Sequence, residues 1–251
     1  SNPIGSLLLS SDGYIYGATV SGAQQGNGAI FKTTYSGTTT SIYSFNTPSG
    51  AGGNIMQAND GNLYGSTQFG GDSQNDGTIY KIIPQGPTFS TFYSFSNNNK
   101  YTHDGSSPVG KLVQGNDGNL YGTTQVGGYY GSGVIYQLAL NGRESVIYSF
   151  PNRINNIMIS PSGLLLANDG NFYGVTWAGG DNNLGTVFKF NQLESLTIIY
   201  SFTGKNGDGR NPTSALIQAN DGTLYGTAGG GTYGYGVVFK IPPIESTVAS
   251  F

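Results

Sequence analysis

The chain has 251 residues, of which 42 are glycine, 18 are tyrosine and 13 are phenylalanine, and only 9% are charged. Low charge with a high aromatic content argues against disorder. The net charge of −3 offers no basic surface for nucleic acid, and no apolar run is long enough for membrane insertion. The absence of cysteine excludes disulfides and thiol catalysis but leaves the cellular compartment open.

A short segment of the form DG-x-x-YG recurs five times along the chain. An apolar stretch precedes each copy, such as SLLLSS before the first and ALIQAN before the last. Two further blocks follow each copy, such as GTIYK and FYSF in the second repeat, and the weakest closing block is VASF at 248–251. The five cores begin at Asp12, Asp60, Asp117, Asp169 and Asp221. An internal repeat of this kind decides the fold class before any local pattern does.

Each repeat predicts four strands in a fixed order. The apolar stretch is the first strand, and its nearly continuous hydrophobicity predicts burial on both faces. The Asp-Gly pair predicts a tight turn, because glycine tolerates positive φ and aspartate bonds its own backbone. The LYG-x-T segment, the IFK-like block and the YSF block then supply the second, third and fourth strands.

Four-stranded repeats of about fifty residues are typical of β-propeller blades, whereas the coils of the competing repeat fold, the parallel β-helix, are usually shorter. We therefore predict an all-β, five-bladed β-propeller with four antiparallel strands per blade. A single domain is expected over 1–251, with repeats at about 1–45, 46–95, 96–150, 151–202 and 203–251. The chain opens on a first-strand segment and closes on a fourth-strand segment, so we expect a complete domain whose first and last blades meet by face packing.

The run NGDGRNPTSALIQANDGTLYGTAGGG, followed by GVVFKI, resembles the bacterial tandem-repeat family called GloVer, from Gloeobacter and Verrucomicrobia. The resemblance covers almost the whole chain, although Leu9 and Leu166 replace the glutamine of the family pattern in repeats one and four. It implies a β-propeller exposed at or beyond the cell surface. A looser likeness to the five-bladed animal lectin tachylectin-2 implies sites for N-acetylated sugars repeated around the ring.

The repeated polar positions are interpreted as scaffold. We expect the five core aspartates to form turns and the tyrosine of each DG-x-x-YG core to pack between blades with its hydroxyl bonded. A lysine closes the third-strand block in four repeats, and Gln137 takes its place in the other. These side chains are expected to be solvated.

The sequence gives little support for catalysis. It holds a single histidine, His103, without a nucleophile-elbow motif, and three glutamates, each just ahead of a predicted outer strand. Glycoside hydrolysis needs two carboxyl groups facing one sugar bond, and the predicted inner strands carry none. The loop at 72–77 lacks the acidic residue that closes a calcium site. We therefore expect no enzyme, no cofactor and no metal.

Two sets of loops vary between repeats and are rich in Asn, Asp, Gln, Ser, Tyr and Gly: the loops joining the second and third strands, and the loops joining successive repeats. Both sets are expected on one face. The best cleft is expected to pair the Trp177 loop with a neighbouring joining loop, either 152–155 or Asp208–Asn211. The candidate ligand-binding residues are Trp177, Asp181, Asn182, Asp208 and Arg210, with Gln68 and Asp72 in the second repeat and Gln125 and Tyr129 in the third.

Planar amides, carboxylates and aromatic faces suit neutral, hydroxyl-rich ligands. The leading hypothesis is a non-enzymatic, lectin-like propeller with several weak carbohydrate sites, working outside the cell or at its surface as a monomer with glycans as partners. The alternative, at equal weight, is a surface adhesion or spacer module that binds protein. Glycine-rich polar loops are common in any protein, so the loops alone do not decide between them.

Overall fold

A computed structural model describes residues 2–22, 26–46, 54–71, 74–96, 103–151, 159–191 and 195–243. These residues form twenty β-strands and no helix, which confirms the all-β prediction. The chain divides into two compact units, residues 1–164 and 165–251, which are described separately. Within the described ranges, no helix has the length and apolar character needed to cross a membrane.

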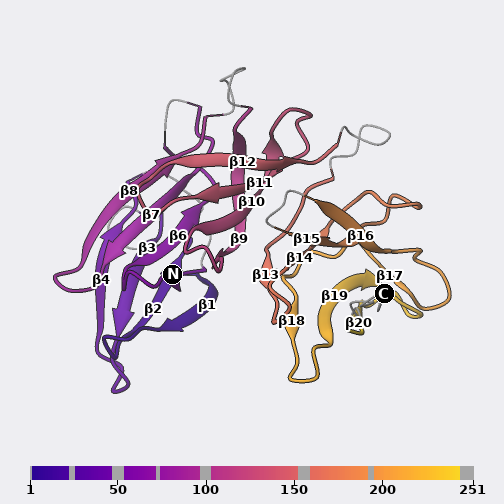
Figure 1. Cartoon of the computed structure of the whole chain (residues 1–251). Helices are drawn as coiled ribbons and strands as arrows, with labels where there is room; N and C mark the ends of the chain where they lie inside the picture. The colour runs from indigo at the N-terminus through magenta and orange to yellow at the C-terminus, as the bar shows by residue number, and fades with distance from the viewer. Residues whose placement is uncertain are drawn as a thin grey trace, which may run out of the picture. The chain divides into compact units, whose positions relative to one another are not determined.

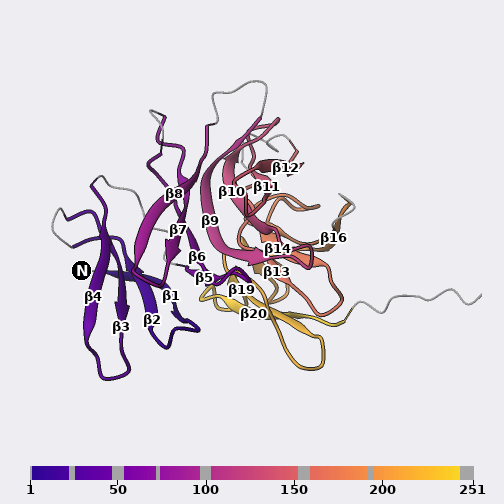
Figure 2. The same ribbon diagram turned by 60° about the vertical axis from the view of Figure 1, so that its left-hand side comes forward.

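The first unit contains three four-stranded antiparallel sheets, each a simple meander (Figures 1 and 2). The first sheet is β1 (Pro3–Leu9), β2 (Ile15–Thr19), β3 (Ala29–Thr33) and β4 (Thr39–Ser44). The second is β5 (Met56–Gln57), β6 (Leu63–Thr67), β7 (Thr78–Ile83) and β8 (Thr88–Ser94). The third is β9 (Gly105–Gln114), β10 (Leu120–Gly127), β11 (Val134–Leu138) and β12 (Glu144–Ser149). The predicted four antiparallel strands per repeat are confirmed in all three.

The second unit contains one complete meander and one further sheet (Figure 1). The complete sheet is β13 (Leu165–Leu166), β14 (Phe172–Thr176), β15 (Thr186–Phe190) and β16 (Leu196–Ser201). In the last sheet, β17 (Gly209–Arg210) and β18 (Ile217–Gln218) both pair with β19 (Leu224–Gly230), which also pairs with β20 (Val237–Ile241). The fourth strand expected at 248–251 lies outside the described residues.

The Asp-Gly turns form as predicted. In the second sheet, the amide of Gly61 donates to the carbonyl of Ala58, and the amide of Ala58 donates to the carbonyl of Asn62. Gly61 has a φ of 79°, in the left-handed region that favours glycine. The turn therefore connects first and second strands through hydrogen bonds between residues close in the chain.

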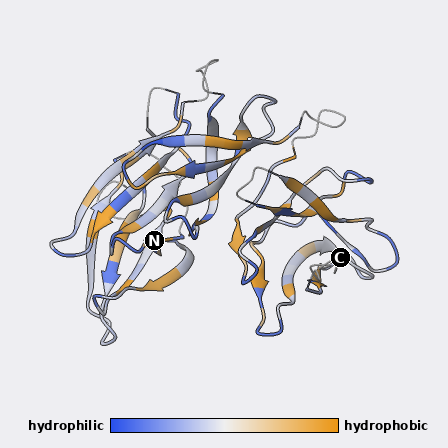
Figure 3. Ribbon diagram, viewed as in Figure 1, coloured by the Kyte–Doolittle hydropathy of each residue, from blue (hydrophilic) through white to orange (hydrophobic). Residues whose placement is uncertain are grey.

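Neighbouring sheets pack through hydrophobic faces. Tyr16 and Ile30 of the first sheet share a buried cluster with Leu63 and Tyr80 of the second. Phe95, at the end of the second repeat, packs with residues of the third sheet in another cluster. Within the second unit, residues of both sheets share a third cluster. Figure 3 shows hydrophobic residues along the strands and hydrophilic ones at many of the turns.

Burial of the first strands, predicted for both faces, is observed in the second and third repeats and not in the first and last. Leu7 is 64% exposed, Leu9 57% and Ile217 68%. The corresponding stretches of the second and third repeats are buried, with Ile55 1% exposed, Met56 6% and Leu112 3%. Three of these strands are also only two residues long.

A glutamine latch joins neighbouring repeats within each unit. The side chain of Gln57 accepts a hydrogen bond from the amide of Ser11 in the preceding repeat and donates one to the carbonyl of Gly61 in its own turn. Gln114 and Gln218 make the same two contacts in their repeats. Repeat four has Leu166 at this position, and the second unit begins at the neighbouring Leu165.

Candidate functional site

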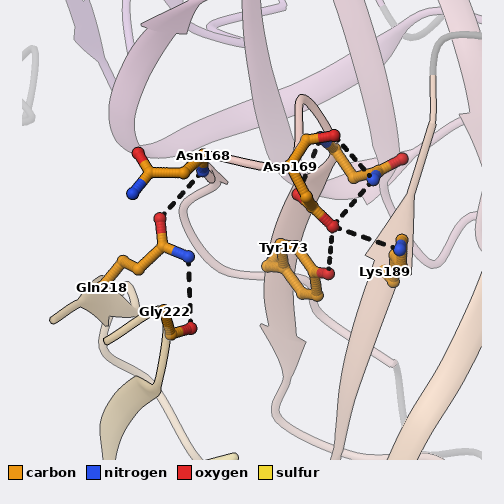
Figure 4. A network of polar contacts seen from close by, with 7 residues as sticks. Asn168, Asp169, Tyr173, Lys189, Gln218 and Gly222 are labelled. Carbon is orange, nitrogen blue, oxygen red and sulfur yellow. Dashed lines mark hydrogen bonds and ion pairs between the residues drawn. The ribbon is translucent and has the colours of Figure 1, made fainter. Parts of the chain in front are cut away.

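The turn aspartates are held in a local network. The Oδ2 atom of Asp169 accepts hydrogen bonds from the Tyr173 hydroxyl at 2.8 Å and the Asn171 amide group at 2.8 Å (Figure 4). The hydroxyls of Tyr16, Tyr64 and Tyr121 bond the aspartates of their own cores in the same way. The expected turn role of these aspartates and the expected bonding of the tyrosine hydroxyls are thus observed in four repeats.

The prediction that the third-strand lysines are solvated holds for Lys240, which is exposed, whereas Lys81 and Lys189 are partly exposed and also pair with the turn aspartates of their repeats. Lys189 Nζ lies 3.2 Å from Asp169 Oδ2, and Lys81 Nζ lies 3.7 Å from Asp60 Oδ2. Gln137 replaces this ion pair by donating to Asp117 at 3.0 Å and to the Tyr121 hydroxyl at 2.7 Å. The antiparallel register sets Lys189 opposite Tyr173, which brings its side chain to the turn carboxylate.

Replacing Asp117 with alanine should lower the free energy of unfolding by about 1 to 2 kcal/mol, because it removes the acceptor of the largely buried Tyr121 hydroxyl and of Gln137. Urea denaturation would measure this change. Asp221→Ala is the matched control, since Asp221 bonds its own turn at Thr223 but no tyrosine hydroxyl among the described residues. An equal loss of unfolding free energy in both variants would show that the hydrogen bond from the tyrosine hydroxyl contributes nothing to stability.

The variable loops meet at the other end of the second strands. In the second unit, the Asn211 side chain donates to the carbonyl of Trp177 at 2.8 Å, and the Asn211 amide donates to the carbonyl of Leu184 at 2.7 Å. Asn211 adopts a φ of 50° and holds both ends of the Trp177 loop. Of the two expected neighbours, the joining loop at Asp208–Asn211 is therefore placed beside Trp177. The other, 152–155, lies outside the described residues.

The five candidate residues of this cleft have different surroundings. Trp177 is 42% exposed, and the side chains of Asp181 and Asn182 are exposed without a partner among the described residues. Arg210 is also exposed, on β17.

Asp208 instead shapes its own loop. Its carboxylate accepts hydrogen bonds from the amide and hydroxyl of Thr203 and from the amide of Gly209. Burial raises the pKa of Asp208, but these hydrogen bonds outweigh it and hold the pKa below its usual value. Its oxygens are therefore largely committed to the loop.

In the first unit, the candidate ligand-binding residues are grouped differently from the prediction, which placed Gln68 with Asp72 and Gln125 with Tyr129. Gln68 Nε2 lies 3.4 Å from Gln125 Oε1, so these two residues form one cross-repeat amide pair. Tyr129 contacts His103 and Tyr130, with ring centroids 4.8 Å away in each case. The sequence analysis found no partner for His103, because His103 and Tyr129 lie far apart in the chain. His103 lies in the segment before β9, and Tyr129 lies in the loop after β10. Asp72 lies outside the described residues.

Most of the exposed aromatic side chains lie in the loops between second and third strands. The sequence analysis selected Trp177 and Tyr129 but missed the other members. The full set is Phe69, Tyr129, Tyr130, Trp177, Tyr233 and Tyr235, with Tyr235 97% exposed. Their recurrence in the loops of four repeats was a signal available in the sequence.

A partly buried carboxyl group also escaped the sequence analysis. Burial and the nearby Asp104 raise the pKa of Glu144 to about 8, and its buried Oε1 atom has no hydrogen-bond partner among the residues that the structure describes. Asp104 accepts a hydrogen bond from the Tyr93 hydroxyl at 2.8 Å. Among the described residues, no three acidic or histidine side chains gather as they would around a metal ion.

A sequence model of the family described as the Gloeobacter/Verrucomicrobia repeat matches residues 1–158 and residues 145–251. The chain belongs to this repeat family. No curated protein matches it. The resemblance drawn from the repeated motifs is thus confirmed.

Solved structures show the fold of this Gloeobacter/Verrucomicrobia repeat protein. A catalytically inactive virginiamycin B lyase from Staphylococcus aureus, solved with quinupristin, is 17% identical with a TM-score of 0.61, over 96% of this chain and 70% of that one. A putative gluconolactonase is 16% identical with a TM-score of 0.55, over 95% and 76%. The PQQ-bound aldose sugar dehydrogenase from Streptomyces coelicolor is 16% identical with a TM-score of 0.58, over 96% and 80%. The fold is therefore propeller-like.

These neighbours overturn the expectation that the chain is not an enzyme. Several carry enzyme names, so this fold supports catalysis. The sequence argument failed because a repeat fold can assemble reactive groups from loops far apart in the chain, without a local motif. At these identities the neighbours show the fold alone, and they assign no reaction to this chain.

Proposed function

We propose that this protein is a five-bladed propeller that binds neutral glycans outside the cell, through the loops between its second and third strands. The observation that carries the proposal is the set of exposed aromatic side chains in these loops, with Trp177 and Tyr129 among them. Aromatic faces pack against the C–H side of a sugar ring, and exposed aromatic clusters are typical of binding surfaces. Five sequence repeats and five sheets support the blade number.

The polar groups beside the aromatic rings suit the same ligand. Among the described residues, the Gln68–Gln125 pair leaves an amide acceptor on Gln68 and a donor on Gln125 without a partner, and these complement the donor and acceptor of an acetamido group. In the same loop as Trp177, Asp181 and Asn182 offer groups for ring hydroxyls that have no partner in the described part of the chain. Each site is shallow, but several on one protein can engage a multivalent glycan with increased avidity.

The test is a glycan array followed by calorimetry with the best N-acetylated sugar. Trp177→Ala should raise the Kd of its site by about tenfold, which corresponds to the binding free energy of one aromatic stacking contact. Tyr35→Ala is the control, because Tyr35 is 75% exposed but lies in the turn between β3 and β4. Binding should change little between low and moderate salt, since charge is not the attraction.

Two outcomes would contradict the proposal. Absence of binding to every glycan on the array would favour the alternative, a surface adhesion or spacer module that binds protein. An equal loss of sugar affinity in Trp177→Ala and Tyr35→Ala would show that the aromatic loops are not the binding site. Product analysis after incubation with each bound glycan would reveal any accompanying turnover.

A further inference from the structure

Two pockets lie at the Asp-Gly end of the sheets, away from the aromatic loops. The pocket in the first unit has a volume of 300 Å³, and its lining includes Asp12, Gln57, Asp60, Pro84 and Gln85. One pocket in the second unit has a volume of about 320 Å³, and its lining includes Asn168, Asp169, Gln218, Gly222, Leu224 and Pro242. Both are at the lower end of the size range of small-molecule sites.

The two pockets occupy equivalent positions in the repeat. Each lies between the turn aspartate of one repeat and the latch glutamine of the next, Asp12 with Gln57 and Asp169 with Gln218. Figure 4 shows this arrangement in the second unit, where Gln218 bridges the Asn168 amide and the Gly222 carbonyl. The recurrence in two separate units shows that the pocket is a product of the repeat and not of one irregular loop.

A proline residue in the lining distinguishes these two pockets from the equivalent positions of the other repeats. Pro84 directly follows β7, and Pro242 directly follows β20, and each lines its pocket. The third strands of the remaining repeats are followed by Thr34, Ala139 and Asn191. The sequence therefore marks the second and fifth repeats with an apolar wall at this end.

The polar lining retains hydrogen-bonding capacity. A carboxylate offers about four lone-pair positions, and Asp12 uses two of them, for the Tyr14 amide and the Tyr16 hydroxyl. Burial raises the pKa of Asp12, but the hydrogen bond from Tyr16 and further bonds outweigh it, so the pKa lies below its usual value and the group is ionised at neutral pH. The side chain of Asn168 is exposed and has no partner among the described residues.

The charge of the lining favours a neutral ligand over a cation. Lys81 lies 3.7 Å from Asp60, and Lys189 lies 3.2 Å from Asp169, so one carboxylate at each pocket is already paired. Carboxylate and amide oxygens accept from hydroxyl groups, while proline with Leu224 offers an apolar wall to C–H groups. We propose that each pocket binds one sugar ring or a polyol of similar size, as a second class of site distinct from the aromatic loops.

The two classes of site lie at opposite ends of the same strand. Asp169 precedes the start of β14, and Trp177 follows its end. A variant in one site therefore leaves the other in place. The pocket proposal does not depend on the loop site, and Trp177→Ala serves as the background in which to test it.

The experiment is a titration of ¹⁵N-labelled Trp177→Ala protein with N-acetylglucosamine, glucose and glycerol, observed by NMR. Sugars should shift the amide signals of Gly61 and Gly222, which lie at the two pockets, and each pocket should bind one ligand. Gln85→Trp should remove the shifts at Gly61, and Asn168→Trp those at Gly222. Asn116→Trp is the matched control, since Asn116 precedes the turn aspartate of repeat three, is exposed and lines neither pocket.

Circular dichroism melting of each variant would verify that it folds. The proposal is overturned if no sugar shifts Gly61 or Gly222, or if the shifts survive in the Gln85→Trp and Asn168→Trp double variant. It is also overturned if glycerol and both sugars shift the two glycines equally at equal concentration, because the pockets would then bind an adventitious additive only. Failure of the loop-site proposal would appear separately, as unchanged binding by Trp177→Ala.

Discussion

Gly174→Ala should lower the free energy of unfolding by about 3 kcal/mol, at the upper end of the usual cost of overpacking a core. Gly174 belongs to β14, in the FYG segment with which the fourth repeat matches LYG of the other repeats, and its backbone φ is outside the left-handed region. A Cβ atom at this position would collide with the ring of Phe188, which is fully buried. The neighbouring residues cannot yield easily, because Phe188 belongs to the adjacent strand and is held by the sheet register.

Chemical denaturation of Gly174→Ala and of Gly229→Ala would check this prediction. Gly229 lies on β19, where the nearest atom to an added Cβ is the carbonyl oxygen of Arg210 at 3.3 Å. The control variant should therefore lose much less stability. Comparable losses of unfolding free energy in the two variants would mean that replacing glycine acts through the backbone and that Phe188 can move to accommodate the added methyl group.

Glu144→Gln should remove a pH dependence of stability between about pH 4.5 and 8. Burial, together with the charge of Asp104, raises the pKa of Glu144 to about 8 in the folded protein, from an ordinary value of 4.5. Between these values the unfolded chain releases a proton that the folded protein must retain, so stability falls as pH rises. The stabilising contribution is complete below about pH 4.5 and lost by about pH 8.

The Glu144→Gln variant should therefore match the parent protein at pH 4.5 and exceed its free energy of unfolding at pH 8, on the order of 2 kcal/mol. Thermal or urea unfolding from pH 4.5 to 9 would measure the difference. Asp181→Asn is the control, because Asp181 is an exposed carboxylate without a partner among the described residues. Parallel pH profiles for Glu144→Gln and the parent would show that Glu144 is ionised without cost in the folded state.

Local chemistry explains why much of the fold was predictable from the sequence. Each Asp-Gly turn depends on contacts within a few residues, such as the bonds that Asp60 receives from Asn62 and Tyr64. Five aligned copies then repeat the same strand order, so the four-stranded antiparallel sheets follow from the turns and the strand patterns. The sequence also indicated Trp177 and the variable loops as the polar, aromatic part of the molecule.

The tertiary structure alone decided the contacts between distant residues. The register of antiparallel strands placed Lys189 against Asp169, 20 residues away in the chain. Packing of neighbouring repeats paired Gln68 with Gln125, selected Asn211 as the partner of Trp177 and buried Glu144. The steric role of Gly174 likewise depends on a ring from another strand. Single-sequence patterns report short-range preferences, whereas these contacts arise only when separate strands and repeats pack together.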